Sequence, residues 1–202
     1  KRALVDTGGD IEAAVTLLRE KGMAQAAKRA GRETTEGIVG YTLSSDGKAG
    51  TLVAVGCETE PVSKNDEFQA FAEKVLKAVD AEGVDAVERF ETERQELVAK
   101  LGENIAIVGK AHFTATNGGE ISAYVHPPAN KLGVLVQLRS NDGELGRKLA
   151  MHIAASAPQW IGRDDVPEDV VTTEREIYAN SDEVQSKPEQ AREKIVEGML
   201  NK

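Results

Sequence analysis

Two stretches of the chain follow the same plan, and this repeat constrains the fold more strongly than any other feature of the sequence. In residues 50–79 and again in 133–156, a glycine precedes an apolar run, a short acidic loop follows, and a segment with apolar residues at helical spacing comes next. The apolar runs are typical of buried strands, and the later segments of amphipathic helices. The repeat predicts an α+β protein with two related halves, each an antiparallel sheet covered by helices on one face.

Turn signals indicate where the strands pair. The sequence SSDGKAG, residues 44–50, separates two β-rich runs and predicts a hairpin in the first half. In the second half, the runs 104–116, 120–127 and 131–140 are typical of strands, and TNGGE forms a turn between the first two. We expect these three strands to belong together. The inward face of the helix that follows is expected to carry Leu145, Leu149, Ile153 and Met151.

Both ends of the chain are predicted to be helical. Asp10 can cap a helix, Gly22 is expected to end it, and a second helix of small residues follows. Near the C-terminus, two charged helical segments each begin close to a proline, as first turns of helices often do. The sequence thus predicts a helical module, two α+β subdomains and a C-terminal helical segment, with the boundaries 1–32, 33–102, 103–165 and 166–202.

Composition restricts the partners that the chain can have. Its 202 residues carry a formal net charge of -9, and nucleic-acid affinity depends on neutralising phosphates with basic residues, so direct binding to nucleic acid is not expected. No apolar run approaches the roughly 18 residues of a membrane span, and no signal peptide is visible. The single cysteine excludes an intramolecular disulfide and fits a reducing compartment. A cytoplasmic protein without membrane association is expected.

The histidines do not indicate a catalytic site. The sequence contains no HExxH, GxSxG, GxxxxGK[ST] or GxGxxG motif. His112 lies in a strand-like run, His126 precedes two prolines, and His152 lies in the predicted helix of the second half. Isolated histidines are more often structural or exposed than catalytic.

The acidic loop of the first half, GCETEPVSKNDEF, leaves several kinds of chemistry open. Glu58 and Glu60 could be paired acids of a glycosidase, could bind a hard cation with Asp66, or could flank Cys57 as a nucleophile. Aromatic residues for sugar binding are scarce, the spacing does not match a calcium loop, and no base accompanies the thiol. We therefore expect no enzyme, no catalytic residue, no metal ligand and no cofactor, and the loop fits protein recognition better.

Several segments resemble the bacterial translation elongation factor Ts family, in the family's order and across essentially the whole chain. They are KRALVDTGGDIEAAVTLLREKGMAQAAKRAGRETTEG, GTLVAVGCETEPVSKNDEFQAFA, LGENIAIVGKA, GVLVQL, AMHIAAS, DDVPEDVV and KPEQAREKIVEGML. The resemblance implies a guanine nucleotide exchange factor that binds elongation factor Tu carrying GDP, perturbs its Mg²⁺ and phosphate-loop site, and promotes GDP release. It also implies that residues 1–32 have a UBA-like helical fold that docks on the partner's GTPase domain.

The family segment associated with displacing Mg²⁺ on the partner matches Thr59, Glu60, Pro61 and Val62. Glu60 keeps a carboxylate on a longer stem, whereas Pro61 stands where the family has an aromatic residue that wedges between partner side chains. Proline cannot reproduce that wedge. An alternative is therefore a protein that binds elongation factor Tu but whose exchange activity is weakened or lost through Glu60 and Pro61.

The resemblance implies further contacts with the partner. Lys1 and Arg29 match basic positions of the helical module, although isolated surface charges have the same appearance. Leu132 and Gly133 match a contact at a strand start that could also be a plain turn, and His152 matches a histidine near the partner's phosphate loop. Some family members pair through the second half, so a homodimer is a further alternative. The family also begins before Lys1 and continues past Lys202, so both ends are expected to be incomplete.

Overall fold

The computed structural model describes residues 1–140 and 142–201, which form two compact units, Lys1–Ser156 and Ala157–Lys202. The first unit contains, in chain order, α1 (Arg2–Asp6), α2 (Ile11–Arg29), β1 (Glu36–Leu43), β2 (Ala49–Cys57), α3 (Glu60–Ser63), α4 (Asp66–Glu82), a 3-10 helix (Val84–Phe90), α5 (Glu91–Leu101), β3 (Ile105–Thr114), β4 (Glu120–Val125), β5 (Gly133–Leu138) and α6 (Gly143–Ser156). The α+β class predicted from the sequence is confirmed.

The first sheet is antiparallel, with the strand order β1-β2-β3. The β1–β2 hairpin turns through residues 44–48, as its sequence predicts, and the Ser44 Oγ–H donates to Asp46 Oδ1 at 2.7 Å within this turn. The expectation that β3 belongs with the second half is wrong, because Ile105–Thr114 pairs along β2 from Cys57 to Ala49. Pairing with β2 completes the backbone hydrogen bonds of an edge that would otherwise lie open next to the core.

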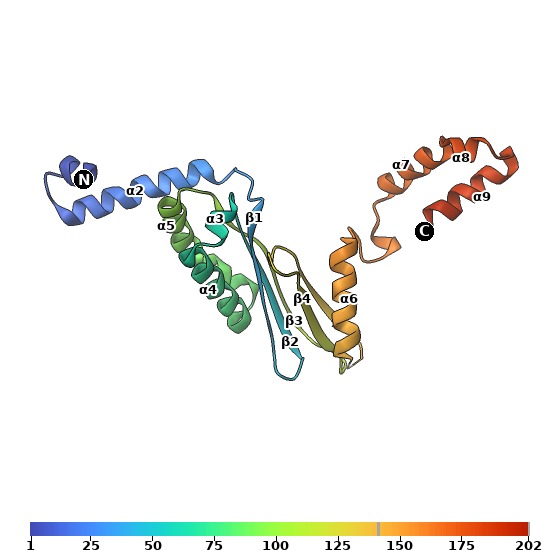
Figure 1. Cartoon of the computed structure of the whole chain (residues 1–202), viewed down its shortest axis with the longest axis horizontal. Coiled ribbons are helices and arrows are strands. Elements are labelled where there is room, and N and C mark those ends of the chain that lie inside the picture. Colours follow the sequence, from blue (N-terminus) through green and yellow to red (C-terminus); the bar gives the residue numbers. More distant parts are fainter. Residues whose placement is uncertain (141, 202) are drawn as a thin grey trace. The chain divides into compact units, whose positions relative to one another are not determined.

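Helix α4 covers one face of the first sheet (Figure 1). It begins after Asn65, whose side chain accepts hydrogen bonds from the N–H groups of Glu67 and Phe68, and its apolar stripe packs onto β2. The ring of Phe71 meets Phe90 edge-on, with 6.0 Å between centroids. The largest fully buried side chains of this core are Phe68, Phe71, Ile105, Val53, Val55, Val75, Val79 and Val98.

The second sheet pairs β4 with β5 antiparallel and lies against the other face of the first sheet. Two glycines permit this close approach: a Cβ on Gly50 would lie 2.6 Å from Ile121, and one on Gly133 would lie 2.6 Å from Val39. Helix α6 covers the outer side of β4 and β5 (Figure 1). The repeat of hairpin, loop and helix predicted from the sequence is thus present in both halves.

The inward face predicted for α6 is wrong in three of its four residues, and only Ile153 is partly buried. Gly146, Ala150 and Ala154 are the residues that face the sheet, whereas Leu145 and Leu149 are 52% and 38% exposed. A Cβ on Gly146 would collide with the hydroxyl of Ser122, so the helix lies too close to β4 for a large side chain at this contact. Small residues spaced four apart therefore form the packed face.

Gly22 does not end the first long helix, contrary to our expectation. Helix α2 continues to Arg29, and Gly22 is buried in its middle, where an added Cβ would lie 2.8 Å from Cβ of Ala99 on α5. The glycine allows two helices to touch rather than stopping one of them. The predicted cap at Asp10 is confirmed, since its side chain accepts from the N–H of Ala13 at 3.0 Å.

The second unit is helical, with a 3-10 turn (Arg163–Asp165), α7 (Glu168–Ala179), α8 (Asp182–Gln185) and α9 (Glu189–Leu200). Pro167 and Pro188 precede the first turns of α7 and α9, as the sequence predicts. Val184 and Val196 are buried, and Arg175 forms an ion pair with Glu197 across the two longer helices.

The four domain boundaries predicted from the sequence remain predictions. Among the residues that the structure describes, none of the helices has both the length and the apolar character that crossing a membrane requires.

Candidate partner-binding site

The segment Thr59–Val62 connects β2 to the main helix of the first half. Thr59 has an extended backbone, and Glu60–Ser63 form the short helix α3, with Pro61 in its first turn, where a missing N–H leaves no hydrogen bond unmade. Thr59, Glu60 and Pro61 are exposed, whereas Val62 packs against the core. The structure therefore presents an acid and a proline to solvent on a base that is fixed to the core.

The C-terminal side of this segment is held by local hydrogen bonds. The Ser63 Oγ–H donates to the carbonyl of Glu60 at 2.7 Å, and Asn65 caps α4 immediately afterwards. Lys64 pairs with Glu60 at 2.8 Å, and its hydrogen bond and charge lower the pKa of the Glu60 carboxyl. Both side chains of this pair are mostly exposed, so the pair adds little stability and leaves the carboxylate open to an incoming partner.

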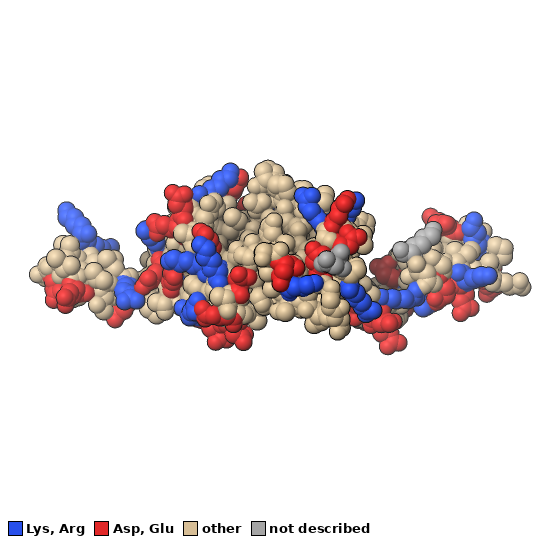
Figure 2. Space-filling view, turned by 90° about the horizontal axis from the view of Figure 1, so that it is seen from below, with Lys and Arg blue, Asp and Glu red and all other residues tan. Residues whose placement is uncertain are grey.

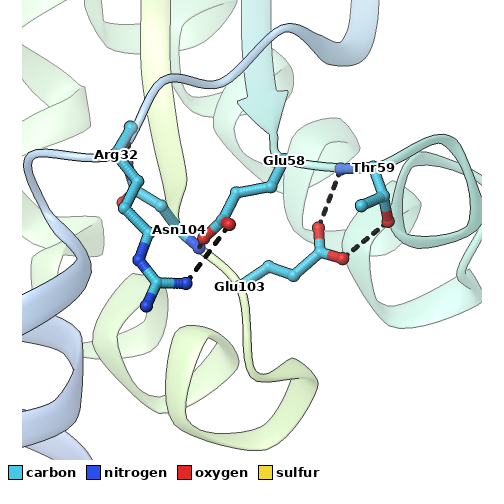
Figure 3. Close-up of polar contacts among 5 residues, drawn as sticks. All are labelled: Arg32, Glu58, Thr59, Glu103 and Asn104. Atoms are coloured by element: carbon cyan, nitrogen blue, oxygen red, sulfur yellow. Dashed lines mark hydrogen bonds and ion pairs between the residues drawn. The ribbon is translucent and has the colours of Figure 1, made fainter.

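The N-terminal side of the segment is joined to the start of β3 by a reciprocal set of contacts, which we call the clasp (Figure 3). The Glu103 carboxylate accepts from the Thr59 N–H at 2.9 Å and from its hydroxyl at 2.6 Å. The Glu58 carboxylate accepts from the Asn104 N–H at 2.6 Å. Arg32 completes the clasp, because its carbonyl accepts from Asn104 Nδ2 at 2.7 Å and its guanidinium lies 3.4 Å from Glu58.

The clasp makes Glu58 a structural acid rather than a free one. The N–H of Asn104 and the charge of Arg32 lower the pKa of Glu58. Glu58 and Glu60 thus have different partners, and neither has the raised pKa that a general acid of a glycosidase needs. Among the described residues, no group of three or more His, Cys, Asp or Glu side chains is arranged to hold a metal ion.

Cys57 is fully buried at the end of β2, with Sγ 3.3 Å from the carbonyl of Thr59. Burial, with the nearby charge of Glu103, raises the pKa of the thiol to about 11. A buried thiol with this pKa is protonated at neutral pH and is a poor nucleophile. Cys57 therefore acts as a packing residue below the exposed segment.

The histidines lie in three separate places. His112 Nδ1 is 2.8 Å from the hydroxyl of buried Thr51, which donates to Asp80 at 2.7 Å. His126 is exposed and contacts the hydroxyl of Tyr124. His152 is exposed on α6, with Nε2 3.5 Å from Ser156 Oγ. The structure therefore does not bring the histidines together with the acids of the loop.

The predicted contacts of the second half lie at the same end of the first sheet as the Thr59 segment. The turn before Leu132 and Gly133 is bound to β1, since the Val39 N–H donates to the Asn130 carbonyl at 2.6 Å, and Lys131 pairs with Glu36 opposite Cys57. Leu132 is 42% exposed, and Gly133 begins β5. Helix α6 runs back along the sheet after β5, so its C-terminal half, the part of the sequence that contains His152, lies toward the same end of the fold (Figure 1).

The two basic residues predicted as partner contacts differ in exposure. Lys1 is exposed in front of α1. Arg29, the last residue of α2, is only half-buried, and its Nη1 is buried beside Gly102 with no hydrogen-bond partner among the described residues. Its guanidinium charge contributes to lowering the pKa of Glu58, so Arg29 also acts on the clasp from within the protein.

Sequence reasoning missed Glu103 and Asn104. They lie 44 and 46 residues after their partners Thr59 and Glu58, beyond α3, α4, the 3-10 helix and α5. In the sequence, their segment LGENI carries no signal beyond its place in a stretch that resembles the family. Glu103 lies at the start of one predicted strand, and Glu58 lies at the end of another. Once the pairing of β3 with β2 is known, these two acids are expected at the same junction, and this is the signal that could reveal the clasp.

The α+β fold of the first unit thus presents an exposed acidic segment that is bonded to the fold on both flanks, an arrangement that suits contact with another protein. Comparisons with known proteins identify the class more closely. Residues 58–202 match the family model described as Elongation factor TS. The chain is 43% identical to elongation factor Ts of Halorhodospira halophila over 212 residues, which covers 100% of this chain and 72% of that protein.

Other relatives agree. Elongation factor Ts of Alkalilimnicola ehrlichii is 40% identical over 212 residues, covering 100% of this chain and 72% of that protein. Elongation factor Ts of Yersinia pestis is 41% identical over 206 residues, with 100% and 70% covered. The chain therefore belongs to the elongation factor Ts family, and the family implies a role in the elongation stage of translation.

Proposed function

We propose that this protein is a guanine nucleotide exchange factor that binds elongation factor Tu in its GDP-bound form and promotes the release of GDP. The observation that carries the proposal is the segment Thr59–Val62, in which Glu60 and Pro61 are exposed while both flanks are bonded to the fold. Family membership supports the same role. Exchange makes and breaks no covalent bond, so the proposed function requires no catalytic residue and no cofactor.

Exchange is a coupling between two ligands of the same partner. If this protein weakens GDP binding by some factor, GDP must weaken the binding of this protein by the same factor. In GTPases the phosphates of the nucleotide are held by the phosphate loop and Mg²⁺. A roughly ten-thousandfold faster release requires about 5.5 kcal/mol of barrier lowering. A few interface groups supply energies of this size when they are held in place before binding.

The charge and rigidity of the segment suit this task. Glu60 offers a carboxylate that is ionised at neutral pH, since its pKa is lowered, and such a group competes with the ligands of a partner's Mg²⁺. Pro61 fixes the backbone next to it. We expect Leu132, Gly133 and His152 to contact the partner at the same end of the fold, and Lys1 and Arg29 through the helical module.

The proposal is tested by the release of a fluorescent GDP analogue from the cognate elongation factor Tu, with and without this protein. We expect release to accelerate with protein concentration until it saturates. An unchanged release rate at concentrations that saturate complex formation would refute exchange.

A second candidate function is binding to elongation factor Tu with weak or no exchange, and it rests on Pro61. This exposed proline presents a small ring and cannot act as an aromatic wedge. This candidate predicts complex formation without faster release, and restored release for Pro61→Phe. If the unmodified protein is already a fast exchanger and Pro61→Phe changes nothing, the wedge is dispensable here.

The division of the chain and its further partners also remain proposals. We propose a UBA-like module in residues 1–32, subdomains 33–102 and 103–165, and a C-terminal segment 166–202. On the face drawn in Figure 2, positive and negative side chains are interspersed, which favours protein partners over nucleic acid. A homodimer through the second subdomain is tested by measuring the molar mass in solution over a range of concentrations.

A further inference from the structure

Thr59 precedes α3 but does not cap it. Its backbone has the extended conformation of a capping residue, with φ -130° and ψ 154°, yet its side chain makes no hydrogen bond to the helix. A threonine at this position ordinarily accepts from a free N–H of the first turn. Here the hydroxyl donates to Glu103 instead, and the backbone N–H of the same residue donates to the other oxygen of that carboxylate.

Two hydrogen bonds to one carboxylate fix Thr59 more firmly than a single cap would. The pair restrains the side-chain rotamer through the hydroxyl and the peptide plane through the N–H. Glu60 and Pro61 follow directly, and the ring of Pro61 fixes its own φ. The direction in which the exposed acid and proline leave β2 is therefore set by Glu103, a residue 44 positions later in the chain.

We infer that Glu103 is a positioning residue for nucleotide exchange, acting on the partner only through Thr59. The inference rests on the function proposed above and goes further, because it assigns a role to a residue outside the exposed segment. The Glu103 side chain is occupied by the N–H and hydroxyl of Thr59 (Figure 3), so its contribution is to the orientation of Glu60 and Pro61. Contact groups that are already ordered bind a partner without losing conformational entropy on binding.

The clasp supplies a matched control. Glu58 joins the same two segments, yet its carboxylate bonds to Asn104 and Arg32, whereas the Thr59 hydroxyl bonds to Glu103. Glu58→Gln retains an acceptor for the Asn104 N–H and removes one charge from the clasp. A loss shared by both variants would indicate a general weakening of this junction, and a loss confined to Glu103 variants indicates positioning.

The test measures nucleotide release from the partner as a function of protein concentration for Glu103→Ala, Glu103→Gln, Thr59→Val and the double variant. We expect Glu103→Ala to lower the saturating rate by about tenfold, with the half-saturating concentration within about twofold of the unmodified protein. Glu103→Gln retains one acceptor and should recover part of the rate. Adding Thr59→Val to Glu103→Ala should cost little more, because the two residues act as one unit.

A second readout does not depend on the partner. Hydrogen exchange of the Thr59 amide should become about tenfold faster in Glu103→Ala and stay within about twofold in Glu58→Gln. An unmodified protein that fails to accelerate release overturns the proposed function and this inference with it. An active unmodified protein together with an equally active Glu103→Ala, or with a Thr59 amide that remains protected in that variant, overturns the role of Glu103 alone.

Discussion

The two halves of the first unit share a plan but differ in how they are held together. In the first half, α4 inserts Phe68, Phe71, Val75 and Val79 into the core, and each is at most 2% exposed. In the second half, α6 buries only glycine and alanine positions, while Leu145, Leu149 and Met151 remain largely exposed. Helix α4 is thus held by large buried side chains, and helix α6 by its close approach to the sheet.

This difference suggests why the proposed contact segment lies in the first half. A segment that must hold a fixed direction needs a rigid base, and Val62 rests on the larger core while the clasp joins β2 to β3. The second half supplies exposed apolar side chains and an exposed His152, which suit contacts that adapt to a partner. The first half thus offers a segment that is held rigidly, and the second half offers exposed side chains that can adapt to a partner.

The largest expected effect is on the core of the first half. Phe71→Ala removes a fully packed ring that contacts Phe90 and should lower the free energy of unfolding by about 3–5 kcal/mol. The matched change Leu149→Ala in α6 should cost less than about 1 kcal/mol, because that side chain is 38% exposed. Urea unfolding of both variants checks the difference, and equal losses would contradict the contrast between the halves.

The next prediction concerns the close approach of α6 to β4. Gly146→Ala should lower the free energy of unfolding by about 1–3 kcal/mol, because the new Cβ collides with Ser122. An alanine within a helix is otherwise favourable by up to about 1 kcal/mol. Gly198→Ala in α9, where nothing lies within 4 Å of an added Cβ, provides the control and should be neutral or stabilising. A stabilising Gly146→Ala would show that the helix can move away from the sheet.

A smaller effect is expected from acid. The hydroxyls of Thr42 and then Thr51 donate to Asp80, and these hydrogen bonds lower the pKa of its carboxyl below the ordinary value near 3.8. A carboxyl whose folded pKa is lowered contributes stability that is fully present above its unfolded pKa and is lost as the pH falls through its folded pKa. Between about pH 4 and 2, Asp80→Asn should therefore lose less stability than the unmodified protein. Thermal unfolding of both proteins across this pH range measures the difference. If stability falls equally with pH in the two proteins, Asp80 does not make this contribution.

The smallest effect is expected at an exposed ion pair of α4. Glu73 and Lys77 lie one turn apart at 2.5 Å, with both side chains mostly exposed. Glu73→Gln should leave the free energy of unfolding close to that of the unmodified protein, and any change should disappear at high salt. A loss comparable with that of Gly146→Ala would mean that surface charge, rather than the packing of its inner face, stabilises this helix.

Local signals in the sequence predicted much of the fold. The SSDGKAG hairpin, the cap at Asp10 and the helix starts after Pro167 and Pro188 depend on neighbouring residues, so they could be predicted directly. The inward face of α6 could not, because leucines and small residues both recur at helical spacing, and only the distance to β4 decides between them. The role of Gly22 cannot be predicted for the same reason, since it depends on a contact with α5.

The candidate site was predicted only in part. The position of Thr59–Val62 at a strand end before a helix follows from the order of the sequence, and its match to a family segment points to protein binding. The residues that hold it do not follow, because Glu103 and Asn104 meet it only through the pairing of β2 with β3. The pairing joins strands that are far apart in the sequence, and the turn signals do not predict it.

The central claim is that this protein couples its own binding to the release of GDP from elongation factor Tu. The most direct test compares its dissociation constants for the nucleotide-free and GDP-bound partner, since an exchanger must prefer the nucleotide-free form by the factor by which it weakens GDP. We expect this protein to bind the nucleotide-free partner at least about a hundredfold more tightly, a difference of about 2.7 kcal/mol. Equal dissociation constants for the two forms would contradict it and leave a protein that binds without exchanging.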